Sequence, residues 1–186
     1  AVVDLGCGTG AAGAALAGRF QGRELTGIDA SPAMLDKARA TGCYAGLQLA
    51  DAGNWLPPDG TALVFSNALF QWLPGHGAML SRIAAQLPPG AVLAVQMPCQ
   101  HGAPSHRLME EVFRRMVPAR PVPQGLSPVA SAVEYARLLA GQGAVSAWET
   151  EYIQRLPPQD AGHPVRRFTE STGLRPWLAA LDEAEQ

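Results

Sequence analysis

Short apolar runs alternate with helical segments along the first half of the chain. The apolar runs 1–5, 24–29, 47–51, 61–67 and 91–97 are predicted as strands, and segments 11–20, 31–40 and 76–87 as helices. Segment 61–67, TALVFSN, is almost uniformly apolar, which is typical of a strand buried on both faces of a parallel sheet. The alternation predicts an α/β fold, a doubly wound and mostly parallel sheet with helices on both faces.

The second half has a different pattern, with longer helical segments and many prolines. Segments 105–116, 127–143 and 163–181 are predicted as helices, the last interrupted by TGLRPW, and 144–156 as a half-exposed strand. The helix at 31–40 has clear end signals, because Ser31 is a good N-cap and Pro32 a good first residue. In the same way, Ser127 and Pro128 are expected to begin the helix that ends at Gly141.

Length and composition limit the classes of protein to consider. The 186 residues are predicted to form one domain, 1–186, and 47% hydrophobic residues are enough for a core. The net charge of −2 and the lack of a basic run make nucleic acid an unexpected partner. Cys7, Cys43 and Cys99 lack metal-binding spacing, and no apolar stretch approaches about 18 residues. We therefore expect a cytoplasmic protein that binds neither metal nor membrane.

The stretch AVVDLGCGTG, residues 1–10, carries the first chemical signal. A glycine-rich turn between a strand and a helix lets a ligand approach the backbone at a helix N-terminus. The spacing of Gly6, Gly8 and Gly10 differs from the dinucleotide fingerprint G-x-G-x-x-G, and no lysine follows as in a phosphate-binding P-loop. Asp4 would repel a pyrophosphate but can attract an ammonium group.

Polar residues also end the next three predicted strands or follow them closely. In open α/β sheets, ligands lie at the carboxyl ends of the strands. Asp29 can accept hydrogen bonds from both hydroxyls of a ribose, and Asp51 can accept one from an adenine amino group. Met34 or Trp55 is expected to pack on the ring. With Asn67, these positions favour an adenosine-type ligand whose other end is cationic and free of phosphate.

These residues, together with VVDLGCGTG and FSNALFQWL, resemble the class I S-adenosylmethionine-dependent methyltransferases. The more specific motifs NALFQWLP, AVQMP and TGLRPW resemble the trans-aconitate 2-methyltransferase family within that class. The resemblance implies a Rossmann-like sheet of seven strands, the last one antiparallel, with added C-terminal helices. It further implies that the chain is a fragment lacking the N-terminal helix and the last strand of a protein that is monomeric at full length.

The resemblance implies S-adenosyl-L-methionine as cofactor and a small carboxylate, most specifically trans-aconitate, as substrate. A carboxylate nucleophile is already ionised at neutral pH, so we expect no catalytic side chain, only proximity and orientation. The expected cofactor-binding residues are Asp4, Gly6, Cys7, Gly8, Gly10, Asp29, Ala30, Met34, Asp51, Ala52 and Asn67. The expected substrate residues are Gln71, Trp72, His76, Gln96, Arg175 and Trp177.

Alternatives remain open at this point. His76 can equally be a surface residue at a helix start, and Arg175 can equally form a surface ion pair. The loop 99–102 departs from the family, which has a polar stretch containing Asn there, so the acceptor is less defined than the cofactor. Other acceptors are an acyl-carrier-protein carboxyl, or an oxygen or nitrogen of another metabolite. Two further classes are a nicotinamide oxidoreductase, disfavoured by the glycine spacing and Asp4, and a non-catalytic binding module.

Overall fold

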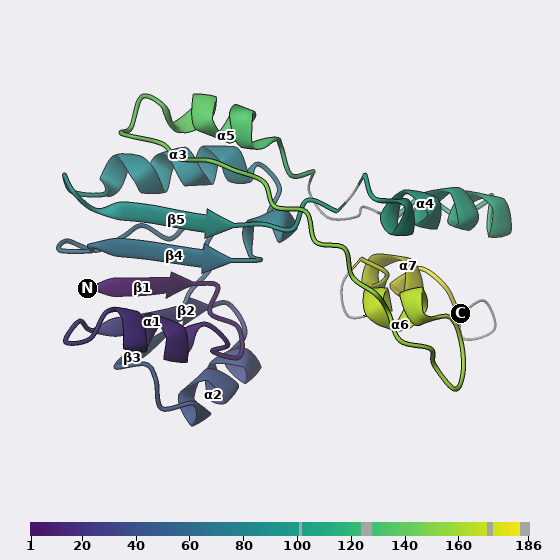
Figure 1. The fold of residues 1–186 in the computed structure, drawn as a ribbon, viewed down its shortest axis with the longest axis horizontal. Coiled ribbons are helices and arrows are strands. Elements are labelled where there is room, and N and C mark those ends of the chain that lie inside the picture. Colours follow the sequence, from purple (N-terminus) through teal and green to yellow (C-terminus); the bar gives the residue numbers. More distant parts are fainter. Residues whose placement is uncertain (101, 124–127, 171–172, 183–186) are drawn as a thin grey trace. The chain divides into compact units, whose positions relative to one another are not determined.

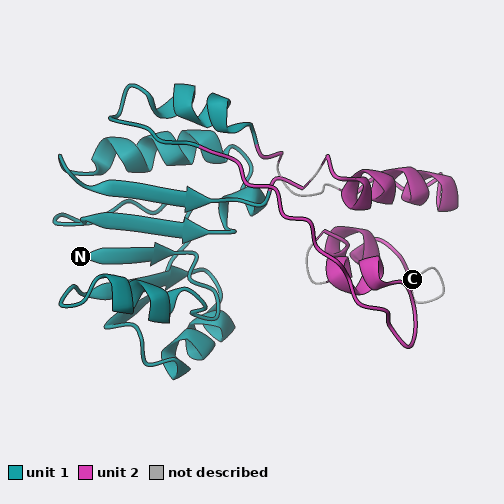
Figure 2. Cartoon of the chain, viewed as in Figure 1, with its two compact units in different colours: residues 1–98, 130–147 teal, residues 99–129, 148–186 magenta. Residues whose placement is uncertain are grey.

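The computed structural model describes residues 1–100, 102–123, 128–170 and 173–182. It contains a parallel sheet and a set of helices, drawn in Figure 1. The chain divides into two compact units, shown in Figure 2: residues 1–98 with 130–147, here called unit 1, and residues 99–129 with 148–186, here called unit 2. The two units are described separately below.

Unit 1 is built on a five-stranded sheet in the order β3-β2-β1-β4-β5, with every neighbouring pair parallel. The strands are β1 (Val2–Leu5), β2 (Leu25–Asp29), β3 (Gly46–Leu49), β4 (Leu63–Asn67) and β5 (Val92–Gln96). All the strands expected in the first half therefore form. The order reverses between β1 and β4, and such a switch point is where open α/β sheets bind ligands.

Helices cover the sheet on both faces, as the alternation predicts. They are α1 (Gly13–Arg19), α2 (Pro32–Ala40), α3 (His76–Gln86) and α5 (Ala132–Leu139), with a short 3₁₀ turn, η1 (Phe70–Trp72). Ser31 caps α2 as expected, because its hydroxyl accepts a hydrogen bond from the Met34 N–H at 3.4 Å. Pro32 is the first residue of that helix.

Strand β1 distributes its side chains between two core clusters. Val3 and Leu5 pack with Leu80 and Ile83 of α3, whereas Val2 packs with Leu16 of α1. Successive side chains of a strand point to opposite faces of the sheet. Asp4 therefore shares the face of Val2, on the side of the sheet that α1 covers, and this places a carboxylate under the glycine turn.

Unit 2 contains α4 (Pro104–Met116), α6 (Pro164–Glu170) and α7 (Arg175–Ala179). Phe113 of α4 and Trp177 of α7 are in ring contact, with centroids 5.4 Å apart. Arg175, within the expected interruption TGLRPW, already begins α7, and Thr172 of that stretch lies outside the described residues. Among the described residues, no helix is long and apolar enough to cross a membrane.

Two expectations for the second half are wrong. Segment 144–156 is not a strand, although its apolar and polar residues alternate. Alternation creates a strand only where a neighbour supplies hydrogen bonds, and no described strand pairs with this segment. The helix expected from Ser127 begins instead at Ala132, capped by Ser131, and Ser127 itself lies outside the described residues.

Candidate cofactor and substrate site

The glycine turn after β1 consists of three glycines in the left-handed region. Their φ angles are +74° at Gly6, +54° at Gly8 and +83° at Gly10, which only glycine adopts without strain. A β-carbon on Gly6 would lie 2.8 Å from the Leu69 side chain, whereas one on Gly8 would meet nothing within 4 Å. Gly6 is thus required for packing inside the protein, and the open space at Gly8 is where a ligand can approach the backbone.

Asp29, the last residue of β2, holds this turn in place. Its Oδ2 accepts a hydrogen bond from the Gly8 N–H at 2.9 Å, and its Oδ1 accepts one from the Ser31 N–H at 2.9 Å. Each carboxylate oxygen has two lone pairs, so both oxygens can still accept a hydrogen bond from a ligand hydroxyl. The carboxylate expected to bind a ribose therefore also positions the glycine backbone beside it.

Asp4 is buried, with 2% of its surface exposed, and has a partner that the sequence did not reveal. The Tyr44 hydroxyl donates a hydrogen bond to Asp4 Oδ2 at 2.6 Å, across 40 residues of sequence. Burial raises the pKa of Asp4, the Tyr44 hydrogen bond lowers it, and the nearby Asp29 carboxylate raises it. No motif contains Tyr44, and only the glycines opposite its ring could have indicated its position.

Cys7 is buried at 6% exposure and packs with Leu35 and Ala38 of α2. Burial raises the pKa of its thiol to about 12, and the carboxylates of Asp4 and Asp29 contribute. A thiol with this pKa is protonated at neutral pH, and only the thiolate is a strong nucleophile. Cys7 is therefore a small neutral packing residue in this structure.

The segment after β3 carries the residues expected near an adenine. Asp51 is exposed, and its Oδ1 accepts a hydrogen bond from the Gly53 N–H at 2.8 Å. Ala52 and Trp55 are buried in the core cluster with Val3, so the Trp55 ring is a core group. Met34 is 38% exposed, which leaves it as the side chain of the expected pair that a ligand ring can reach. Ala30, which follows β2, is exposed as well.

The end of β4 has an unusual backbone. Ala68 has a φ of +54° and is the one described non-glycine residue with a positive φ. Its N–H donates to the Gln96 carbonyl at 3.0 Å, and its own carbonyl accepts from Gln71 Nε2 at 2.7 Å. Such a conformation costs about 1–3 kcal/mol and persists where neighbours hold it. These two contacts fix the turn that follows Asn67.

Gln71 itself is buried, with 3% of its surface exposed. Its Oε1 is a buried oxygen without a hydrogen-bond partner among the described residues. Such atoms are rare in folded proteins, because an unmade hydrogen bond leaves the desolvation cost of the group uncompensated. The amide nitrogen of Gln71 already donates one hydrogen bond to the Ala68 carbonyl, whereas the oxygen can accept from a further donor.

His76 differs from both readings of the sequence, since it is neither at the surface nor open to a substrate. It is 6% exposed and begins α3. Its Nδ1 lies 3.1 Å from the Leu73 carbonyl and its Nε2 lies 2.6 Å from the Tyr135 hydroxyl. A carbonyl can only accept, which assigns the proton to Nδ1 and makes Tyr135 the donor to Nε2. His76 thus connects α3 to α5, and neither ring nitrogen remains for a substrate.

The other expected substrate residues divide between the units. Trp72, 42% exposed, and Gln96 lie in unit 1, and Gln96 pairs with Asn67 in the register of β4 and β5. Arg175 is exposed and Trp177 half-buried, both on α7 in unit 2. The structure thus gathers residues at the ends of β1, β2, β4 and β5, while Arg175 and Trp177 belong to the other unit.

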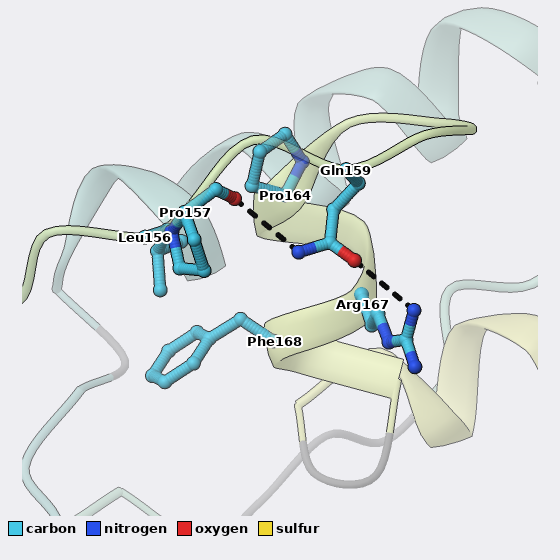
Figure 3. Close-up of a pocket in the computed structure, with 6 residues that line it drawn as sticks. All are labelled: Leu156, Pro157, Gln159, Pro164, Arg167 and Phe168. Atoms are coloured by element: carbon cyan, nitrogen blue, oxygen red, sulfur yellow. Dashed lines mark hydrogen bonds between the residues drawn. The ribbon is translucent and has the colours of Figure 1, made fainter.

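A pocket of about 190 Å³ lies within unit 2, as Figure 3 shows. Gln159 spans part of it, since its Nε2 donates to the Pro157 carbonyl at 3.3 Å and its Oε1 accepts from Arg167 Nη1 at 3.0 Å. Leu156, Pro164 and Phe168 complete the lining. None of the site residues expected from the sequence lines this pocket. No group of three or more metal-ligating side chains gathers in the part of the chain that is described.

The chain is similar to known methyltransferases. A family described as a methyltransferase domain matches residues 2–90. A trans-aconitate 2-methyltransferase from Escherichia coli O1:K1 / APEC is 40% identical over 187 residues, which cover all of this chain and 71% of that protein. The chain belongs to the trans-aconitate 2-methyltransferase family. A second relative with that name, from Rhodococcus jostii (strain RHA1), is 41% identical over 99% of this chain and 72% of its own length.

Membership of this family confirms the resemblance that the motifs indicate, and it makes the protein a methyltransferase. Among solved structures, the DhpI-SAM-HEP complex matches 75% of this chain and 68% of that chain, with a TM-score of 0.54 and 21% identity. At that identity the match concerns the fold alone. It agrees with the expected Rossmann-like architecture, of which the parallel sheet of unit 1 is the core.

Proposed function

We propose that this protein of the trans-aconitate 2-methyltransferase family methylates a carboxylate of trans-aconitate. The observation that carries the proposal is the pair of carboxylates at the glycine turn, Asp4 and Asp29, in a chain whose relatives of that name align over its whole length. S-adenosyl-L-methionine supplies the methyl group when it is bound. Its ribose, its ammonium group and its lack of phosphate suit carboxylates beside an open backbone.

The residues of unit 1 have distinct proposed tasks toward this cofactor. Asp29 accepts hydrogen bonds from the ribose hydroxyls, and the buried Asp4 attracts the ammonium group. Asp51 accepts a hydrogen bond from the adenine amino group, with Met34 packing on the ring. The open face of Gly8 admits the ligand to the backbone. The remaining expected cofactor residues, Gly6, Cys7, Gly10, Ala30, Ala52 and Asn67, shape the walls.

The acceptor needs binding and alignment rather than a base. A carboxylate is ionised at neutral pH, so this chain's contribution is to hold it, to orient it and to exclude water from it. We propose Trp72, Gln96, Arg175 and Trp177 for this task, together with Gln71, because an amide N–H can donate a hydrogen bond to a carboxylate. His76 does not share this task, because both of its ring nitrogens are hydrogen-bonded within the protein.

The cysteines bear on the compartment in which the protein acts. We propose a cytoplasmic enzyme whose partners are small molecules and which is monomeric. All three cysteines are free in the structure, and Cys99 is exposed, which suits a reducing compartment.

Two measurements on the full-length protein test the proposed activity. Isothermal titration with S-adenosylhomocysteine should show binding, and mass spectrometry should show a monomethyl ester when trans-aconitate and S-adenosylmethionine are supplied together. Binding of S-adenosylhomocysteine without methylation of trans-aconitate would contradict the proposed acceptor, but not the assignment as a methyltransferase. A screen of other carboxylates, acyl-carrier-protein carboxyls included, would then identify the acceptor.

Arg175 provides a sharper test of the acceptor side. A substrate with three carboxylates leaves two that need partners, and a guanidinium can bind one of them bidentately. Arg175→Leu should raise the KM for trans-aconitate at least about tenfold, or about 1.4 kcal/mol, with cofactor affinity changed less than about twofold. Arg23→Leu, at an exposed arginine in the turn before β2, is the matched control. Loss of cofactor binding with an unchanged KM for trans-aconitate would contradict the assignment of Arg175 to the acceptor site.

A further inference from the structure

The structure assigns Tyr44 as the positioning residue of Asp4, holding that carboxylate toward the cationic end of the cofactor. The assignment rests on the proposed cofactor site. Tyr44 lies in the loop between α2 and β3, outside every motif that indicates a methyltransferase. It contacts the site in two ways: its ring lies against glycines of the site, and its hydroxyl bonds to Asp4.

The Tyr44 ring occupies a slot that three glycines create. A β-carbon would lie 2.8 Å from Tyr44 Cε2 if built on Gly13, 3.1 Å from Cε2 if built on Gly10, and 2.9 Å from Cδ1 if built on Gly27. Real β-carbon contacts are essentially never shorter than 3.0 Å. Neither Gly13 nor Gly27 has the positive φ of Gly10. The ring is one of the groups that leave no room for a β-carbon there, beside Cys43 Cβ at Gly13 and Leu47 Cδ2 at Gly27.

The slot directs the hydroxyl onto a single atom of the site. It donates to Asp4 Oδ2 at 2.6 Å, a short distance typical of a charge-assisted hydrogen bond. Among the described residues, no donor is bonded to Asp4 Oδ1. One oxygen is therefore fixed by Tyr44, and the other is left for a cationic ligand. Without Tyr44, the carboxylate could turn about its χ angles on the buried face of β1.

The charges around Asp4 show why the hydroxyl matters. Burial raises the pKa of Asp4, and the negative charge of Asp29, at the end of β2, raises it further. Cys7 also lies near but is a neutral thiol, since its own pKa is raised to about 12. Tyr44 is the group that lowers the pKa of Asp4, and its own pKa is raised by burial and by Asp4, so it remains a donor at neutral pH.

The test is Tyr44→Phe in the full-length protein, which keeps the ring in its slot and removes the hydroxyl. Without this hydrogen bond the pKa of Asp4 rises, so the carboxylate is lost by protonation at a higher pH than in wild type. Titration with S-adenosylhomocysteine from about pH 5.5 to pH 8 should show affinity at least about fivefold weaker on the acid side, and recovering as the pH rises. Tyr152→Phe, at an exposed tyrosine, should match wild type throughout.

A double-mutant cycle separates positioning from packing. Asp4→Asn should weaken binding and abolish this pH dependence, and Tyr44→Phe should then add no further loss. Equal losses at every pH, or equal losses with and without Asp4, would overturn the assignment, because they would make Tyr44 a packing residue. If Tyr44→Phe does not fold, Gly13→Ala displaces the ring instead and should give the same shift toward higher pH, whereas an unshifted profile overturns the assignment.

The same titration distinguishes this inference from the proposed function. Wild-type protein that binds S-adenosylhomocysteine, together with an unshifted Tyr44→Phe profile, would overturn the role of Tyr44 alone. Wild-type protein that shows no binding would overturn the cofactor site, and the assignment of Tyr44 with it.

Discussion

The ends of β1 and β4 require the same backbone conformation and obtain it in different ways. After β1, three residues with positive φ are all glycines, at which the left-handed region costs little. After β4, Ala68 has a φ of +54°, and hydrogen bonds to Gln96 and from Gln71 hold it there. The first end is determined by residue type, and the second by hydrogen bonds to residues outside the turn's own position.

The difference decides what each end of a strand can tolerate. The turn after β1 is already shaped by its own sequence, and Asp29 only braces it. The turn after β4 stores strain that two neighbours must offset, and strain of this kind is found mostly at functional sites. A change from glycine to alanine should therefore destabilise the turn after β1, whereas a change from alanine to glycine should cost little in the turn after β4.

The largest expected effect is at Gly6. Gly6→Ala should destabilise the protein by about 3 kcal/mol, because the left-handed conformation costs about 1–2 kcal/mol and the clash with Leu69 adds to it. Gly22→Ala is the matched control, since its φ of +76° is nearly the same but a β-carbon there meets nothing within 4 Å. Denaturant unfolding should show a loss of about 1 kcal/mol for the control. Equal losses would mean that packing at Gly6 contributes nothing.

The next effect concerns ligand binding at the same end. Asp29→Ala should weaken S-adenosylhomocysteine binding by about 1.5–3 kcal/mol, the range for hydrogen bonds to a charged group. Part of this loss comes through Gly8, whose N–H loses its acceptor. Asp36→Ala removes an exposed carboxylate of α2 that pairs with Arg39, and it should leave the titration unchanged. If Asp29→Ala bound S-adenosylhomocysteine with wild-type affinity, the assignment of Asp29 to the ribose hydroxyls would be wrong.

The parts of the fold that follow from local signals are predictable from the sequence. The glycine turn, the strands of unit 1 and the Ser31 cap of α2 each depend on residues within a few positions of one another. The Ser131 cap of α5 was also present in the sequence as Ser-x-x-Glu, ending at Glu134, which forms a capping box. Ser127 is followed by a proline but has no Glu or Gln three positions later, so it lacks the capping box that Ser131 has.

The features that the sequence did not reveal depend on distant residues meeting in space. Tyr44 reaches Asp4 across 40 positions and His76 reaches Tyr135 across 59. Neither pair lies in one motif, and neither has a periodicity that would join its members. The strand predicted over 144–156 is wrong for the same reason. Alternation indicates which face of a segment is apolar, but not whether a neighbouring strand pairs with it. Local geometry is thus predictable from the sequence where a single turn determines it, and not where packing brings distant side chains together.

The smallest expected effect is the reverse substitution after β4. Ala68→Gly should change the free energy of unfolding by less than about 0.5 kcal/mol, because relief of the left-handed strain offsets the larger entropy of the unfolded chain. Ala78→Gly, at an exposed position in α3, has no such strain to relieve and should cost about 0.5–1 kcal/mol. Denaturant unfolding of the two variants measures the difference.

Gln71 sharpens this last comparison, because its amide holds the Ala68 carbonyl. Gln71→Met keeps the volume but removes the donor, so its cost should be smaller by about 0.5–1 kcal/mol when residue 68 is glycine, for which the turn is unstrained. The sign of this coupling is the decisive quantity, since removal of the unpartnered Gln71 Oε1 affects both backgrounds equally. Strictly additive costs would show that Gln71 does not maintain the turn.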